Sequence, residues 1–199
     1  MTQIEVENNT PYRRRVFLHP SGLSLQEPVP LLLTAWKHFD LGPGESIGTA
    51  LGGLRIGARI AQGSMRDHRT VVADAQFGEK WTVGMTNGIP ALSSGAGAPP
   101  NGIQVQNGLD GSEAAVILVT LYWDYAPWFS FEVSPGYQTV YSFTNQLFAY
   151  ASTPIAGGGS ALVMEPAAGK FSLPGGAVRL KLTPTADGTT IQWAMEPRP

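Results

Sequence analysis

Three histidines are the first residues to consider for metal binding or acid–base chemistry, because imidazole titrates near neutral pH and ligates metals. His19, His38 and His68 lie far apart in the sequence, and none has a second histidine two or four positions away. A metal site built on one strand or helix needs such a companion. We therefore expect polar loop or strand-edge histidines and no bound metal.

Nucleophiles and paired carboxylates also lack the context that catalysis needs. The chain has no cysteine, and no serine lies in the Gly-x-Ser-x-Gly turn of hydrolases. The glycine-rich run 157–160 lacks the Lys-Ser/Thr pair that holds phosphate and magnesium. Asp40 and Glu132 each follow a phenylalanine in similar contexts, so a duplicated structural position explains them more simply than a glycosidase pair does. The sequence predicts a non-enzymatic protein without a cofactor.

Aromatic residues are concentrated in residues 121–131, which hold six of them. Alternation along a strand cannot place all of these rings on one face, and residues 125–128 have the composition of a turn. Exposed Tyr and Trp stack on sugars or lie at the headgroup level of a membrane. We predict a ligand-binding surface formed by Tyr122, Trp123, Tyr125 and Trp128. The alternative is that these rings fill a core between two modules.

The order Tyr122-Trp123-Asp124 followed by Pro127-Trp128 resembles the Tyr-Trp-Asp-x-Pro-Trp segment of aegerolysins, with one additional residue before the proline. The opening alternation from Ile4 to Asn9 is also similar to that of small bacterial insecticidal β-proteins. Aegerolysins are single-module, cysteine-poor β-sandwiches that bind membrane lipids, often with a pore-forming partner, and some are insecticidal. The resemblance implies a lipid-binding, toxin-like protein with a second protein component.

Alternation of apolar and polar residues predicts the elements that would position these side chains. Ile4 and Val6 alternate with glutamates, and residues 54–60 alternate between Leu, Ile or Ala and Arg or Gly. Such patterns, bounded by Gly, Pro and Asn, predict half-buried strands. Residues 178–182 and 190–195, joined by the turn at 185–188, predict a hairpin because the turn contains Asp-Gly. No amphipathic helix of ten or more residues is apparent.

The order of strands and turns occurs twice. Residues 4–8 (IEVEN) return as 103–107 (IQVQN), residues 16–18 as 116–118, and residues 39–44 (FDLGPG) as 131–136 (FEVSPG). Residues 72–74 and 78–83 have weaker counterparts at 163–165 and 169–173, and the first copy has an excess of residues at 20–37. Residues 93–102 are small and charge-free, as in a linker.

These patterns predict an all-β fold of two tandem, internally duplicated antiparallel β-sandwich modules. The first spans residues 1–92 and the second residues 103–199, with the linker at 93–102. The two modules either stay separate or share one interface.

Composition and charge limit the choice of partner. Charged residues make up only 14% of the chain and the net charge is −2, so no basic stripe for a nucleic acid is present. The longest apolar stretches are too short to span a bilayer. The first residues lack the pattern of a signal peptide, which favours a cytoplasmic protein or one released by another route.

A binding protein that recognises a membrane lipid or glycan through the aromatic cluster is the function we expect. The alternative is a structural subunit that assembles into a homo-oligomer, which low charge, many glycines and prolines and a duplicated sandwich would suit.

Overall fold

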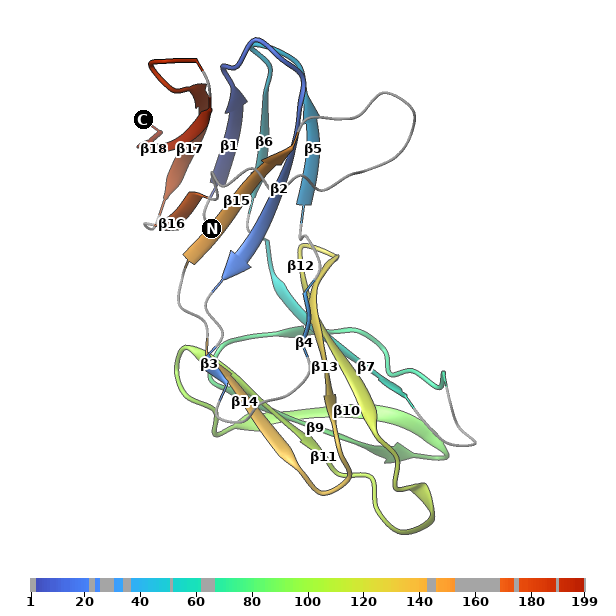
Figure 1. Ribbon diagram of the computed structural model, residues 1–199. Coiled ribbons are helices and arrows are strands. Elements are labelled where there is room, and N and C mark those ends of the chain that lie inside the picture. Colours follow the sequence, from blue (N-terminus) through green and yellow to red (C-terminus); the bar gives the residue numbers. More distant parts are fainter. Residues whose placement is uncertain are drawn as a thin grey trace. The chain divides into compact units, whose positions relative to one another are not determined.

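The computed structural model describes residues 3–21, 24–25, 31–33, 37–50, 52–61, 67–142, 146–152, 169–173, 176–188 and 190–198, with side chains for all but 19–21, 24–25 and 31–33. These residues form strands almost throughout, with one short 3₁₀ helix, η1 (Gly111–Glu113). The predicted all-β class is confirmed. The chain divides into two compact units, and each is a sandwich of two sheets (Figure 1).

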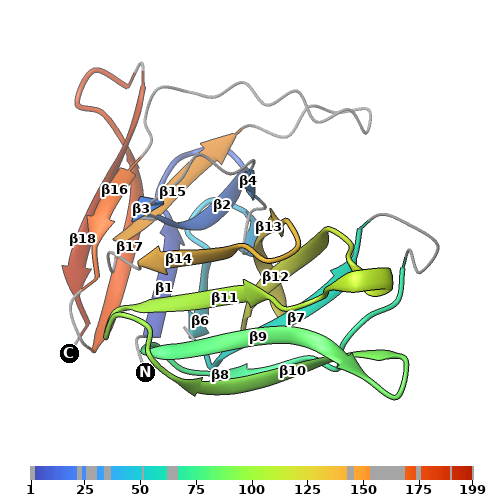
Figure 2. The same ribbon diagram turned by 90° about the horizontal axis from the view of Figure 1, so that it is seen from below.

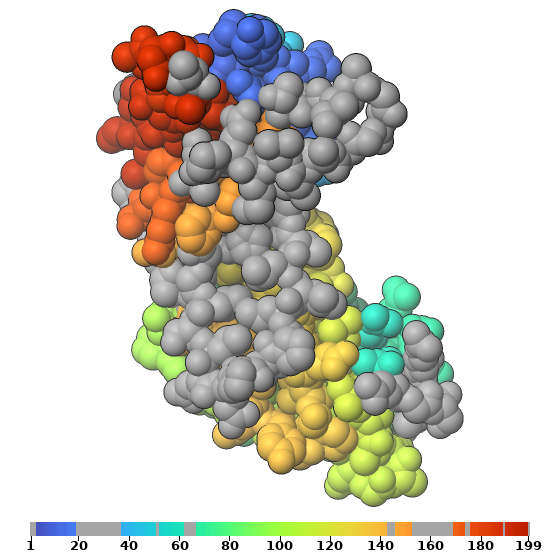
Figure 3. Space-filling view, viewed as in Figure 1, coloured from blue at the N-terminus to red at the C-terminus, as the bar shows by residue number. Residues whose placement is uncertain are grey.

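Unit 1 comprises Met1–Ser21, Ala35–Gly52 and Asn145–Pro199. One sheet has the order β18-β17-β1-β6 and the other β16-β15-β2-β5. The strands are β1 (Gln3–Asn8), β2 (Arg14–Ser21), β5 (Lys37–Leu41), β6 (Ser46–Ala50), β15 (Gln146–Ser152), β16 (Gly169–Ser172), β17 (Ala177–Pro184) and β18 (Ile191–Pro197). Blue atoms from the start of the chain and red atoms from its end therefore pack together (Figure 3).

Unit 2 comprises Gly22–Thr34 and Gly53–Thr144. Its sheets have the orders β10-β9-β11-β14-β3 and β4-β13-β12-β7-β8. The strands are β3 (Ser24–Leu25), β4 (Leu31–Leu33), β7 (Leu54–Ile60), β8 (Ala73–Ala75), β9 (Glu79–Thr86), β10 (Ile89–Ala96), β11 (Gly102–Asn107), β12 (Ile117–Trp123), β13 (Ala126–Val133) and β14 (Gln138–Ser142). Figure 2 shows β14, β11, β9 and β10 side by side, with β10 on the outside.

The compact units do not follow the predicted boundaries at residues 92 and 103. Strands β1, β2, β5 and β6 from the first half combine with β15–β18 from the second, while β7–β10 combine with β11–β14. Each sandwich thus combines the N-terminal strands of one repeat with the C-terminal strands of the other. The tandem arrangement was a wrong prediction because similarity between two halves identifies the order of strands but not which copy of a strand each one pairs with.

The predicted linker at residues 93–102 is also corrected. Ser93 to Ala96 complete strand β10, and the whole of β10 pairs with β9. Gly102 begins β11, and its N–H donates to the Pro99 carbonyl across a tight turn. Small, uncharged residues are typical of linkers, but here they form an edge strand and the turn after it.

Two buried asparagines at the ends of β1 and β11 show the duplication most directly. The Asn8 side chain donates to the carbonyls of Leu41 and Gly42, and Asn107 donates to those of Val133 and Ala115. Gly44 and Gly136, both in the left-handed region, donate their N–H groups back to the carbonyls of Asn8 and Asn107. The matches of 4–8 with 103–107 and of 39–44 with 131–136 are therefore structural equivalences.

Two other matched blocks need correction. Val16 pairs with Phe39 as Val119 pairs with Phe131, so Val16 is equivalent to Val119 and not to Val116. Residues 169–172 form β16, which occupies the place of β8 and not that of β9. Residues 163–165 lie outside the described residues.

The predicted sandwiches are antiparallel except for one parallel pair in each unit. β1 runs parallel to β17, and β11 runs parallel to β9. The predicted C-terminal hairpin is confirmed, because β17 and β18 pair antiparallel from Val178 to Pro184. The excess residues at 20–37 contain β3 and β4, which extend the two sheets of unit 2 at β14 and β13.

Candidate functional site

The aromatic cluster forms the β12–β13 hairpin of unit 2, and the structure divides its members between core and surface. Trp123 and Trp128 are buried, with 7% and 1% of their surface exposed. Their ring centroids lie 4.9 Å apart in an edge-to-face contact. The prediction that these two tryptophans form a contact surface is therefore wrong; they belong to the core of unit 2.

A β-bulge explains how so many rings are buried. The β12–β13 register shifts between Leu121 and Tyr122, so that Phe129 pairs with Leu121 and Pro127 pairs with Tyr122. Trp128 is the extra residue, and both it and its neighbour Phe129 are buried. A bulge places two consecutive side chains on one face, which strict alternation does not allow.

Tyr125 lies at the turn of this hairpin and is 74% exposed. Asp124 and Tyr125 both have positive φ values, 49° and 65°, as a tight two-residue hairpin turn requires. The guanidinium of Arg55 lies 4.3 Å from the centre of the Tyr125 ring. A hydrogen bond to Asp74, 2.7 Å long, fixes the same arginine and raises its pKa.

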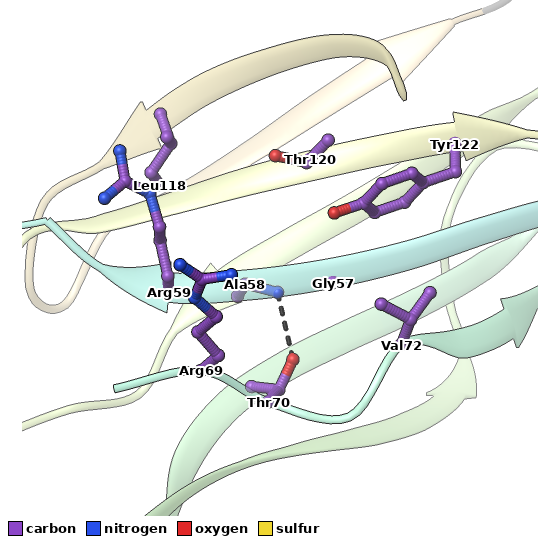
Figure 4. Close-up of a pocket in the computed structure, with 9 residues that line it drawn as sticks. All are labelled: Gly57, Ala58, Arg59, Arg69, Thr70, Val72, Leu118, Thr120 and Tyr122. Atoms are coloured by element: carbon purple, nitrogen blue, oxygen red, sulfur yellow. Dashed lines mark hydrogen bonds between the residues drawn. The ribbon is translucent and has the colours of Figure 1, made fainter. Parts of the chain in front are cut away.

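Tyr122 is half-buried on the outer face of the β7–β12 pair, where a groove of about 290 Å³ opens. Its ring covers the backbone of Gly57, at which a Cβ would lie 3.4 Å from Tyr122 Cε2 and 3.1 Å from Val72 Cγ2. Figure 4 shows Tyr122 and Val72 on either side of Gly57, with the tyrosine hydroxyl directed along β12 toward two arginines. Because Gly57 has no side chain, its backbone forms the floor of the groove.

Arg59 and Arg69 supply the positive charge of the groove. They face each other through an isolated β-bridge, which places their side chains next to one another (Figure 4). Arg59 forms an ion pair with Asp67 at 3.0 Å. Within the described residues Arg69 makes no ion pair, so this end of the groove has two guanidinium groups and one paired carboxylate, Asp67.

Backbone hydrogen bonds hold the segment that carries Arg69 against β7. The N–H of Ile60 donates to the His68 carbonyl, and that of Thr70 donates to the Ala58 carbonyl. The Ala58 N–H in turn donates to Thr70 Oγ1 at 3.0 Å. On the other side of the groove, the Thr120 hydroxyl lies 2.8 Å from that of Ser130. The groove is therefore a fixed arrangement of hydroxyls, one ring and two guanidinium groups.

The residues considered for catalysis do not line this groove. Asp40 forms a two-pronged ion pair with Arg15 at 2.7 and 2.9 Å, which lowers the pKa of Asp40. Glu132 lies at the equivalent place in unit 2, opposite Leu118. His38 and His68 are exposed. The His19 side chain and residues 157–160 lie outside the described part of the chain.

No group of three or more His, Cys, Asp or Glu that could hold a metal ion occurs among the described residues. In the same part of the chain, no helix is long and apolar enough to cross a membrane. Comparison with family models, curated proteins and solved structures finds no match for this chain.

Sequence reasoning identified Tyr122 and Tyr125 but missed Arg59, Arg69 and Thr120. A signal for Arg59 was present, because the alternation in residues 54–60 already placed Arg55, Gly57 and Arg59 on one outward face. What the sequence lacked was the partner strand. Only the β7–β12 pairing, which joins the two repeats, brings Gly57 beside Thr120.

Proposed function

We propose that the protein is a non-enzymatic binding protein whose groove on β7 and β12 holds an anionic group, phosphate or sulfate, carried by a lipid headgroup or a glycan. The observation that supports this most is the grouping of Arg59, Arg69 and the Tyr122 side chain around one groove of about 290 Å³. The proposal keeps the expected lipid or glycan class but moves its contact surface from the tryptophans to this groove.

Guanidinium groups favour this ligand class, because their planar donors match the oxygens of phosphate and sulfate. Asp67 neutralises only one of the two arginines, so an anion would complete the charge balance. The Tyr122 ring offers an apolar face beside the charged end, and Thr120 offers a hydroxyl. An anion joined to a small polar ring, as in a headgroup or a charged sugar, combines these features.

The size of the groove supports a small ligand part. Pockets for drug-sized ligands usually start at about 300 Å³, and this groove lies at that lower limit. Tyr125 and Arg55 stand on the same outer face of the sheet, where they could contact the remainder of a larger ligand. The resemblance to aegerolysins independently implies lipid binding.

Retention on two probes tests the proposal: heparin beads, and vesicles of phosphatidylcholine with and without phosphatidic acid. Arg69→Ala should weaken binding roughly tenfold or more, because a hydrogen bond to a charged group contributes about 1.5–3 kcal/mol. Tyr122→Ala should weaken it as well. Arg13→Ala, at an exposed arginine of unit 1, is the matched control and should bind as the unchanged protein does.

The two arms distinguish the source of the anion. Retention on heparin alone assigns a sulfated glycan, and cosedimentation with phosphatidic acid vesicles alone assigns a lipid phosphate. Binding that Arg13→Ala reduces as much as Arg69→Ala would show non-specific attraction and refute the groove. So would the absence of binding to either probe at low salt.

A further inference from the structure

A second groove, uncharged and apolar, opens between the edge strands β8 and β10 of unit 2. Its volume is about 400 Å³, and it is lined by Val71, Ala73, Thr86 and residues 89–92. Val71 and Ile89 are 87% and 63% exposed. Large aliphatic side chains are seldom left so exposed beside one another without a partner.

Unit 1 shows how the same opening can be filled from within. There Phe171 of β16 and Trp193 of β18 meet edge to face, with ring centroids 6.5 Å apart. Strand registers place Ala75 at the position of Phe171 and Leu92 at that of Trp193. Two aromatic rings are thus replaced by a methyl and an isobutyl group, and Leu92, the counterpart of Trp193, lines the apolar groove of unit 2.

Strand β10 presents a free backbone edge beside this groove. It is eight residues long and pairs only with β9 among the described strands. It contains no charged residue; among the other edge strands, β5, β8, β16 and β18 each contain at least one Asp, Glu or Lys, while β3, β4 and β6 are also uncharged. Charged side chains usually protect edge strands from pairing with another chain. β10 has no charged side chain, and its one proline, Pro90, lies near one end of the strand and leaves residues 91–96 able to pair.

The opposite side of unit 2 shows what covers an edge in this molecule. There β3 and β4, two short extended segments, pair with β14 and β13 and extend both sheets. An added strand is therefore a cover that this sandwich accepts, and a strand has the backbone groups that a free edge needs.

We propose that β10 pairs antiparallel with β10 of a second copy of this chain, forming a two-fold dimer that covers the apolar groove. A symmetric pair brings each strand against its own sequence, and an uncharged strand meets no like charges in that arrangement. The small side chains from Ser93 to Ala96 allow close approach of the two backbones. The dimer uses strands other than those of the anion-binding groove, so the two proposals stand or fall separately.

Geometry restricts the register of this dimer. Residues directly opposite one another in an antiparallel pair point to the same face, and side chains alternate between faces with a period of two. A residue of one copy and the following residue of the other copy would point to different faces of the sheet. Two such residues therefore cannot lie directly across from each other. The two-fold axis must therefore pass through one residue position of β10, and that residue faces its own copy.

The absence of native cysteine makes this testable by single-cysteine scanning over residues 91–95. Each variant can form a disulfide only with the same position of another copy. The residue on the axis has a Cα–Cα separation of about 4.5–5.5 Å, which a disulfide spans. We expect one position, with weaker signals at its neighbours, to give covalent dimers under mild oxidation. Tyr137→Cys, at a residue of 63% exposure in the same unit, is the control.

Sedimentation equilibrium of the full chain provides the second measurement. The unchanged protein should be dimeric at micromolar concentration. Ser93→Lys should raise the dimer dissociation constant at least about tenfold, because two lysines then lie close together near the axis, and Ile89→Lys should raise it too, because it places a charge in the apolar groove that the dimer covers. Tyr137→Lys should leave the dissociation constant unchanged. Both β10 variants should keep the melting temperature, because the residues they replace are exposed.

Three outcomes would overturn the proposal. One is a monomer at all accessible concentrations. This result is expected if the groove binds an acyl chain or a peptide of another protein. Another is a dimer that the β10 lysine variants leave intact. The third is cross-linking of the β10 cysteines at no more than the rate of Tyr137→Cys.

Discussion

Asn8 and Asn107 each connect three segments of their unit through one fully buried side chain. Asn107 Nδ2 donates to the carbonyls of Ala115 and Val133 at 2.9 and 2.8 Å, and its Oδ1 accepts from the N–H of Leu109 at 3.1 Å. Backbone groups in such a position have no water to replace a lost partner. The conformation around β11 therefore depends on this one amide.

Asn107→Ala should lower the free energy of unfolding by about 3 kcal/mol, because it leaves buried carbonyls and an N–H without partners at roughly 1–3 kcal/mol each. Urea unfolding measures this. Gln104→Ala on the same strand loses one exposed hydrogen bond to Gln138 and should cost under about 0.5 kcal/mol. Equal losses in the two variants would contradict the role of Asn107.

Trp128→Ala should cost about 3–5 kcal/mol, as expected for removing a fully buried indole. Tyr125→Ala, three residues away and exposed, should change stability by less than about 0.5 kcal/mol. The pair separates core from surface within one hairpin. A small loss for Trp128→Ala would mean that the ring is not packed as described, and would reopen its role as a contact residue.

At the residue scale, composition indicated the importance of the aromatic hairpin, but periodicity could not predict which of its rings are buried and which are exposed. Strict alternation predicts opposite faces for the neighbours Trp128 and Phe129, and only a bulge places both rings in the core. A bulge depends on how two strands pair, and that information lies in neither strand alone. The half of the candidate site formed by Arg69 had no sequence signal, because it comes from a loop pinned to β7 by backbone bonds.

At the scale of elements, the parallel pair of β1 and β17 carries a line of charges on its outer face. Glu5 lies opposite Arg179 and Glu7 opposite Lys181. The Glu5 carboxylate accepts a hydrogen bond from Arg179 Nε at 2.9 Å, and Arg198 Nε lies 3.3 Å away. The bond to Arg179 is the main cause that lowers the pKa of Glu5.

This pair predicts acid sensitivity of unit 1. Because the pKa of Glu5 is lower in the folded than in the unfolded chain, its contribution is fully present above the ordinary glutamate value of 4.5 and is lost as the pH falls through the folded value. The urea midpoint should therefore fall at acidic pH, and less steeply in Glu5→Gln. Parallel pH profiles for the two proteins would show that Glu5 contributes nothing.

Elements with strong local signals were predicted correctly. The alternation of residues 54–60 forms β7, and the Asp-Gly turn joins β17 to β18. The segment from Ser93 to Ala96 was missed because an uncharged edge strand and a linker have the same composition. Its strand character comes from hydrogen bonds to β9, which no local pattern records.

At the scale of the whole molecule, two repeats are exchanged between two sandwiches. The ladders that cross between the halves are β1 with β17, β2 with β15, β7 with β12 and β9 with β11. Every sheet of both units contains one of these ladders. The sequence could reveal the duplication, but the exchange depends on whether a strand pairs within its own copy or with the other, and both choices bury the same apolar faces.

Expression of fragments distinguishes exchanged from tandem repeats. Residues 1–101 and 102–199, produced separately, should lack cooperative unfolding, because each half loses one strand of every crossing ladder. Mixed, they should restore it. The fragment 53–144, which contains all of unit 2 except β3 and β4, should fold alone. Circular dichroism during thermal melting is the readout, and a cooperative transition in either isolated half would contradict the exchange.

The ion pair of Glu5 with Arg179 joins residues 174 positions apart. A ribosome adds about 5–20 residues per second, so β1 waits roughly 10–35 s for β17 to be made. Strands β7–β14 emerge one after another during that interval, and unit 2 can close while β1 and β2 still expose the apolar faces that β17 and β15 will cover. Strands β1 and β2 are thus made before the strands of unit 2 but are covered after them.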